Sequence, residues 1–154
     1  MTSEIETRLQ ALGFELPAAP KPVANYVPYL LARDQLFVSG QISKAGDGTI
    51  LTGTLGAGLD VVDGQAAARL CALNILAQAK AALGDLGRIK QVLRLTGFVS
   101  SAPGFFDQPL VVNGASDLIG EVLGDAGKHT RAAVGVASLP ANAAVEIDAI
   151  LLVA

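Results

Sequence analysis

Residues 131–153 read RAAVGVASLPANAAVEIDAILLV and contain two apolar runs on either side of a Pro-Ala-Asn turn at 140–142. In the second run, 143–153, every second residue from Val145 to Val153 is apolar. This period of two is typical of a β-strand that buries one face. We therefore predict a β-hairpin in which strands over 131–139 and 143–153 pair around the turn.

The chain before this hairpin contains segments typical of helices as well as strands. Ser3 and Glu6 match a capping box and predict a short helix over 4–12, and the prolines within 16–28 predict an extended connector. The other expected elements, in chain order, are a strand-turn-strand over 29–38, an irregular glycine-rich loop over 46–58, a long helix over 60–83, a strand over 89–100 and a helix over 106–123. This order predicts an α+β fold whose helices cover one face of a sheet.

The composition leaves the chain with little polar surface. Its 154 residues suit a single domain over 1–154, yet only 16% of them are charged and 51% are hydrophobic. We expect part of this apolar excess to be buried between subunits. The net charge of −3 and the lack of a basic run disfavour nucleic acid as a partner.

Membrane and metal partners are disfavoured as well. The first residues are acidic, unlike those of a signal peptide, and no apolar stretch reaches the roughly 20 residues that span a bilayer. We therefore expect a soluble, cytoplasmic protein. One cysteine, Cys71, and one histidine, His129, cannot form a structural zinc site on their own. We interpret Cys71 as a buried small residue and His129 as a loop residue, and we assign neither a role.

Two charged residues within the predicted hairpin are candidates for chemistry, and each has a structural alternative. Arg131 is either an exposed hairpin residue or a guanidinium that binds a carboxylate through two hydrogen bonds. Glu146 is either a residue of an exposed strand edge or a carboxylate that orients a water molecule. On the face of Arg131, small residues at 133, 135 and 137 predict a trough for either a ligand or a neighbouring subunit.

Several of these residues belong to one longer pattern. It consists of Tyr26, the strand end FVSGQ at 37–41, Val112-Asn113, Arg131 with Leu139-Pro140, and Val145-Glu146-Ile147. Over most of residues 24–153 this pattern resembles the Rid/YjgF family of reactive intermediate deaminases, historically called endoribonuclease L-PSP. Its closing signature is an arginine, a Leu-Pro whose proline follows nine residues later, and a glutamate fifteen residues after the arginine.

The resemblance implies a particular architecture. Members of the family have a chorismate-mutase-like α+β fold, with a mixed sheet and two main helices on one face. They form a homotrimer in which the sheets face inward and three sites lie in the clefts between subunits. The N-terminal helix and proline-rich connector over 1–28, together with the glycine-rich loop, make this chain similar to a longer subgroup whose Rid-like core spans 24–154.

The resemblance also implies a reaction. Active members hydrolyse enamines and imines such as 2-aminoacrylate to 2-keto acids and ammonia, with no cofactor or metal. Matched by position, Arg131 would bind the substrate carboxylate and Glu146 would place the attacking water. The other matched residues would line the pocket or lie beside the ligand: Tyr26, Ser39, Gly40, Asn113 and Ala133. Because an imine carbon is already electrophilic, orientation and a placed water are the main requirements.

The chain departs from the family pattern at two places. Ala133 stands where Cys or Thr is common, and Asn25–Pro28 replaces the usual Gly-Pro-Tyr. A non-catalytic trimer that binds a small carboxylate or a protein therefore stays open, whereas the net charge argues against an endoribonuclease. Around the predicted turn, Arg131 and Glu146 are offset by about five residues, roughly 17 Å, so that two chains would be needed to bring them together.

Overall fold

The computed structural model describes residues 2–154. Two of the helices begin at capping boxes. Ser3 and Glu6 form the box of α1, and Asp60 and Asp63 form that of α2. The three helices are α1 (Glu4–Ala11), α2 (Val61–Leu83) and α3 (Gln108–Leu123). They confirm the three helices that the sequence predicts. Within residues 2–154, the helices lack the combination of length and apolar character that a bilayer crossing requires.

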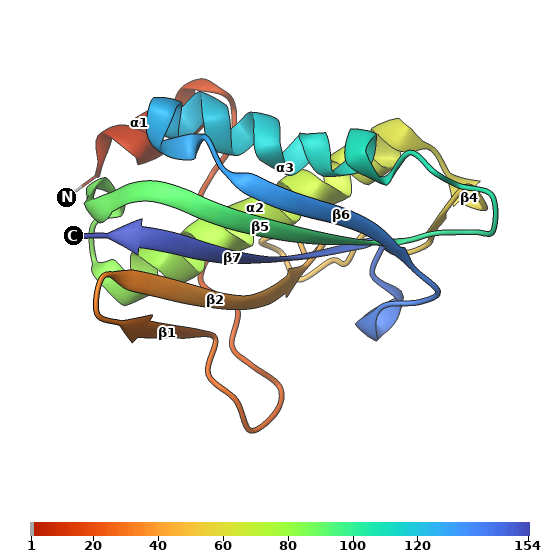
Figure 1. The fold of residues 1–154 in the computed structure, drawn as a ribbon, viewed down its shortest axis with the longest axis horizontal. Helices are drawn as coiled ribbons and strands as arrows, with labels where there is room; N and C mark the ends of the chain where they lie inside the picture. Colours follow the sequence, from red (N-terminus) through yellow and green to blue (C-terminus); the bar gives the residue numbers. More distant parts are fainter. Residues whose placement is uncertain (1) are drawn as a thin grey trace.

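Five strands form one mixed sheet in the order β1-β2-β7-β5-β6 (Figure 1). They are β1 (Tyr29–Ala32), β2 (Gln35–Ile42), β5 (Ile89–Ser100), β6 (Thr130–Val136) and β7 (Val145–Val153). β5 and β6 run parallel, and the other neighbours run antiparallel. β1 and β2 confirm the strand-turn-strand expected from residue 29, and β5 confirms the long strand over 89–100.

The glycine-rich loop contains a small second sheet, so the expectation of wholly irregular structure over 46–58 is wrong. Here β3 (Thr54–Leu55) pairs in parallel with β4 (Gly58–Leu59). The backbone at Gly56 and Gly58 has φ angles of 83° and 104°, a region that favours glycine. These two glycines therefore permit the tight return of the chain that brings β3 and β4 together.

The predicted hairpin over 131–153 is also wrong, because β6 and β7 do not pair with each other. β6 pairs with β5, where Leu95 lies opposite Arg131, and β7 lies between β2 and β5. Parallel neighbours as long as β5 and β6 require a long crossover connection. Helix α3 supplies it, so β5, α3 and β6 form a β-α-β unit. The turn at 140–142, a short 3-10 helix (Pro140–Asn142), instead carries the chain past β5 to β7.

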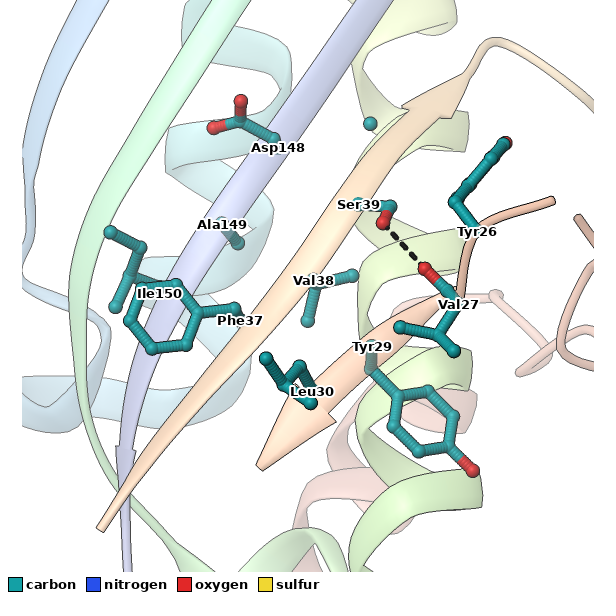
Figure 2. Close-up of a pocket in the computed structure, with 11 residues that line it drawn as sticks. Tyr26, Val27, Tyr29, Leu30, Phe37, Val38, Ser39, Asp148, Ala149 and Ile150 are labelled. Carbon is teal, nitrogen blue, oxygen red and sulfur yellow. Dashed lines mark hydrogen bonds between the residues drawn. The ribbon is translucent and has the colours of Figure 1, made fainter. Parts of the chain in front are cut away.

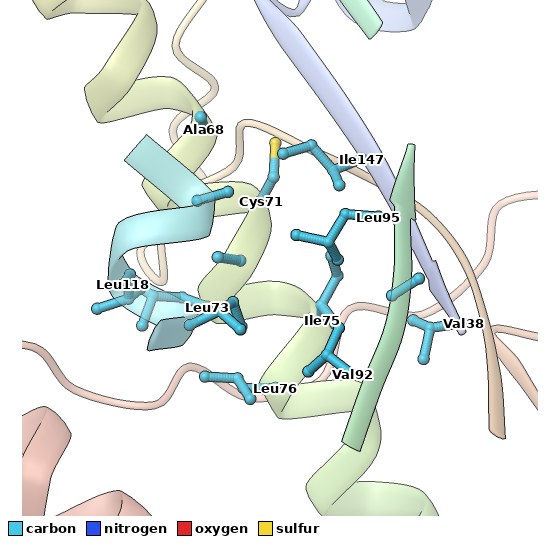
Figure 3. Packing of buried hydrophobic residues seen from close by; sticks show 14 of the residues in the cluster. Val38, Ala68, Cys71, Leu73, Ile75, Leu76, Val92, Leu95, Leu118 and Ile147 are labelled. Atoms are coloured by element: carbon cyan, nitrogen blue, oxygen red, sulfur yellow. The ribbon is translucent and has the colours of Figure 1, made fainter. Parts of the chain in front are cut away.

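The core lies between one face of this sheet and the two long helices. β7 follows the predicted alternation, since its residues 145, 147, 149, 151 and 153 are buried and those between them are half-buried. Figure 3 shows Ile147 and Leu95 of the sheet directed toward Ile75 of α2. Each of these side chains is at most 1% exposed, and full burial of such a side chain contributes about 1.5–3 kcal/mol.

Among the described residues, no helix covers the opposite face of the sheet, which we call the open face (Figure 1). Leu30, Phe37 and Ile150 lie side by side on it, across β1, β2 and β7. Leu30 is 58% exposed and Phe37 is 39% exposed, and Val134 on β6 is 44% exposed. A contiguous apolar surface of this kind usually marks a place where another molecule binds.

Candidate functional site

Two neighbouring cavities lie beside β2 and the connector that precedes β1. The first, of about 420 Å³, is lined by Tyr26, Ser39 and Gly40 and extends across β2 to Asp148 on β7 (Figure 2). The second, of about 350 Å³, shares Tyr26 and Gly40 with the first and is lined by Glu146. The structure thus brings together four of the residues that the sequence singles out: Tyr26, Ser39, Gly40 and Glu146. We call this group the carboxylate half of the site.

A break in the pairing of β2 and β7 shapes this half. The register shifts between Val38 and Gln41, so that Ser39 and Gly40 fall outside the regular ladder. The Ser39 hydroxyl donates a hydrogen bond of 2.8 Å to the carbonyl of Val27, which Figure 2 shows as a dashed line. The backbone N–H of Ser39 donates a second hydrogen bond, of 2.9 Å, to the carbonyl of Pro28. Ser39 therefore holds the connector that carries Tyr26 against the strand.

Gly40 leaves open the space that the carboxyl group of Glu146 occupies. A Cβ atom at this position would lie 2.6 Å from Oε2 of Glu146, so that a larger residue would displace the carboxyl group. Burial raises the pKa of Glu146 above its ordinary value, and the negative charge of Asp148 raises it further. A carboxyl group with a raised pKa exchanges protons more readily near neutral pH, as a general acid or base must.

Asp148 lies beside the carboxylate half, and sequence reasoning did not select it. It lines the first cavity and shares the open face with Glu146. Burial raises its pKa, against the opposing effects of a hydrogen bond from Thr96 and the positive charge of Arg94. The signal that could have identified it is the alternation of β7, which puts a second carboxylate two residues after Glu146.

Arg131 lies on the other face of the sheet, where it contacts α3. It belongs to the edge strand β6 and lies opposite the buried Leu95. Its Nη1 donates a hydrogen bond of 3.1 Å to the hydroxyl of Ser116, and its Nη2 donates one of 3.2 Å to the carbonyl of Pro109. Both acceptors belong to α3, so the helix holds the half-buried guanidinium on its surface.

Asn113 and Ala133 lie near this guanidinium. Asn113 is half-buried on α3, four residues after Pro109 and three before Ser116, a spacing that puts all three on one side of the helix. Ala133 is on the same face of β6 as Arg131 and packs against the core. We call Arg131, Asn113 and Ala133 the arginine half of the site.

At Gly135, part of the trough predicted along this face of β6 is taken up by the protein itself. A Cβ atom at Gly135 would lie 2.7 Å from the amide nitrogen of Gln108 and 3.1 Å from the hydroxyl of Ser101. The small residue at 135 therefore admits Gln108 in the first turn of α3.

The two halves do not meet within one chain. Arg131 lies opposite Leu95 and Glu146 lies opposite Phe98, so the two side chains point to opposite faces of the sheet. Two strand spacings of about 4.8 Å and three residues of about 3.3 Å separate their Cα atoms by about 14 Å. The expected offset between Arg131 and Glu146 was derived from a hairpin that does not form. The two residues are nevertheless far apart within one chain.

The described chain is therefore an α+β protein of chorismate-mutase-like fold, with a charged residue at each of two separate surfaces. The family model described as "YjgF/chorismate_mutase-like, putative endoribonuclease" matches residues 6–151. The chain belongs to this YjgF/RidA family.

Its relatives resemble it over nearly their whole length. Protein TCP17 of Trypanosoma cruzi is 53% identical over 151 residues, which cover 97% of this chain and 94% of that protein. The crystal structure of Atu1372 from Agrobacterium tumefaciens, described as of unknown function, is 55% identical, with a TM-score of 0.91 and coverage of 98% and 93%. The crystal structure described as "a putative endoribonuclease" from Shewanella oneidensis is 39% identical, with a TM-score of 0.93 and coverage of 97% and 99%.

Proposed function

We propose that this protein is an enamine/imine deaminase, which hydrolyses 2-aminoacrylate-like compounds to 2-keto acids and ammonia. Members of the RidA family are deaminases. The observation that carries the proposal is the pair of charged groups: a guanidinium held by two hydrogen bonds and a carboxyl group of raised pKa beside a cavity. A more distant relative, E. coli TdcF, is 28% identical and was crystallised with bound serine, a small molecule that carries a carboxylate.

Arg131 would bind the substrate's carboxylate. A guanidinium has five N–H donors, and Arg131 uses one toward Ser116 and one toward Pro109, which leaves three. Two parallel donors suffice for the paired hydrogen bonds that bind a carboxylate. This interaction orients the imine without taking part in the bonds that form or break.

Glu146 would place the water and move its proton. As the water oxygen bonds to the imine carbon, the Glu146 carboxylate accepts one proton from the water and passes it to the imine nitrogen, which gives a carbinolamine. The carboxylate then accepts the proton of the carbinolamine hydroxyl and gives it to the departing nitrogen, so that the C–N bond breaks, the C=O bond forms and ammonia leaves. The products are a 2-keto acid and ammonia, and the carboxylate is regenerated.

A complete site would need two copies of the chain, because Arg131 and Glu146 of one chain lie on opposite faces of the sheet. We propose a homotrimer whose open faces turn inward, with each site formed from the carboxylate half of one protomer and the arginine half of the next. The exposed Leu30, Phe37 and Val134 support a buried open face.

The test is ammonia release from freshly generated 2-aminoacrylate. We expect the unsubstituted protein to accelerate it and Arg131→Ala to abolish that acceleration. Arg33→Asn is a matched control, because it removes an exposed arginine from the β1–β2 turn and asparagine tolerates the φ of 56° at this position. Equal rates with the unsubstituted protein and Arg131→Ala would overturn the proposal.

A second candidate function is a trimer of the same fold that binds a small carboxylate or a protein without catalysis. It is favoured by Ala133, which packs against the core and offers no polar side-chain atom. Tight binding of 2-ketobutyrate with no turnover of any imine would support this candidate. Cleavage of RNA that depends on Arg131 would support the endoribonuclease of the family description, which the net charge of −3 disfavours.

A further inference from the structure

A chain of hydrogen bonds links the guanidinium of Arg131 to the main chain before β6. Nη1 of Arg131 lies 3.1 Å from the hydroxyl oxygen of Ser116 on α3. This oxygen lies 2.8 Å from Nε2 of His129, and Nδ1 of His129 lies 2.6 Å from the carbonyl oxygen of Gly127. Neither Ser116 nor His129 has a part in the proposed reaction.

The chemistry of the atoms gives these hydrogen bonds a direction. The carbonyl of Gly127 can only accept, so Nδ1 of His129 carries a proton and donates. In the neutral ring Nε2 then accepts a hydrogen bond from the Ser116 hydroxyl. The oxygen of Ser116, having donated its own hydrogen, accepts from the arginine. Each of these polar atoms has a partner in this arrangement.

The far end of this chain of hydrogen bonds is fixed in space. Gly127 is buried at the end of the short 3-10 helix η2 (Gly124–Gly127). A Cβ atom added to it would lie 2.5 Å from the carbonyl oxygen of Ile119 on α3. Only glycine permits this close packing, which holds the Gly127 carbonyl against the same helix that carries Ser116.

We propose that Ser116 and His129 are positioning residues, which hold the guanidinium of Arg131 in the orientation that binds the substrate's carboxylate. This inference rests on the proposed function, and it names two residues that act through Arg131 without touching the substrate. An arginine side chain that is free in solution loses rotational freedom when it binds a ligand. Here the freedom is already lost on folding, so the binding of a carboxylate costs less.

The first experiment separates binding from catalysis. Ser116→Ala removes the hydroxyl, His129→Phe keeps a ring without its nitrogens, and Ser116→Thr keeps the hydroxyl. We expect Ser116→Ala and His129→Phe to raise KM for the imine and the Kd of 2-ketobutyrate about five- to tenfold, with kcat within about twofold. Ser116→Thr should stay near the unsubstituted values.

Thr130→Ala is the matched control. It deletes the hydroxyl next to Arg131, which donates to the carbonyl of Leu93 and does not touch the guanidinium. This variant should leave KM, kcat and Kd unchanged, and thermal unfolding of each variant checks that the fold is retained. A change in kcat alone, or equal changes in Thr130→Ala and Ser116→Ala, would overturn the positioning role.

A second measurement needs no ligand. In ¹H–¹⁵N NMR spectra of the Arg131 guanidinium, we expect slow rotation about the Nε–Cζ bond in the unsubstituted protein and in Thr130→Ala. We expect faster rotation in Ser116→Ala and His129→Phe. Unchanged rotation in both variants overturns the positioning role. If instead the unsubstituted protein neither hydrolyses imines nor binds 2-ketobutyrate, the proposed function is the part that fails.

Discussion

The arginine half holds its charged group with hydrogen bonds to α3, whereas the carboxylate half leaves Glu146 beside a cavity, where burial and Asp148 raise its pKa. A group that binds a ligand gains from fixed geometry. A group that transfers protons gains from a shifted pKa. From this contrast we infer that the protein prepares geometry at one surface and reactivity at the other, and the following predictions test this division.

The largest effect is expected in the carboxylate half. Glu146→Gln keeps the size of the side chain and removes the proton acceptor, so we expect kcat for imine hydrolysis to fall by about 10²- to 10⁴-fold. The Kd of 2-ketobutyrate should change little, because in the proposed function Arg131 binds the carboxylate. Steady-state kinetics and titration with the keto acid measure the two effects.

Asp148→Asn is the matched substitution for this prediction. It removes a second carboxylate from the same face of β7, and it should reduce kcat far less than Glu146→Gln. Equal losses in the two variants, or a large rise in the Kd of 2-ketobutyrate for Glu146→Gln, would contradict the division of labour between the halves.

A smaller effect is expected where α3, which holds Arg131, packs on α2. A Cβ atom at Gly114 would overlap the main-chain oxygen of Gln65, so we expect Gly114→Ala to lower the free energy of unfolding by about 2 kcal/mol. Gly120, on the same helix, has open space around its Cα. Gly120→Ala should therefore raise the free energy of unfolding by about 0.5–1 kcal/mol.

Urea unfolding at one fixed protein concentration measures both glycine variants. Equal effects of the two substitutions would mean that the close approach of α3 to α2 does not hold the arginine half in place.

The smallest effect concerns the pH dependence of stability. The pKa of Glu146 in the folded protein lies above its ordinary value of 4.5, so between these two pKa values the folded state binds more protons than the unfolded state. Stability contributed by this group is present below pH 4.5 and is lost as the pH rises through the folded pKa. We therefore compare the free energy of unfolding of Glu146→Gln with that of the unsubstituted protein at each pH. The difference in favour of Glu146→Gln should be larger at pH 7 than at pH 4.

Urea unfolding at the two pH values measures this difference. The same relative stability at both would mean that the carboxyl group of Glu146 is not perturbed in the folded protein.

Local patterns predicted the elements of this fold well. The capping box of Ser3 and Glu6 predicted α1, and the alternation of β7 predicted which of its side chains are buried. These signals succeed because hydrogen bonds at a helix end and the period of a strand depend on residues close together in the sequence. The pattern around Arg131 and Glu146 indicated the family, which the family match confirms.

The contacts of the candidate residues were not predictable in the same way. Ser116 and His129 are thirteen residues apart, and only the return of β6 alongside β5 brings the histidine to α3. One sign was available: His129 precedes Arg131 by two residues, so that in an extended segment the two side chains share a face. Nothing local indicated that the shared face would meet a serine.

Residue order alone thus predicts the three helices and the strands of the main sheet, the apolar face of β7 and the family to which the chain belongs. The partners of β6 and β7 emerge only in the folded molecule, because an alternating strand can bury its apolar face beside any neighbour. The β-α-β crossover through α3 places β6 beside β5, so that β7 lies in the middle of the sheet. In this register Arg131 and Glu146 point to opposite faces of the sheet.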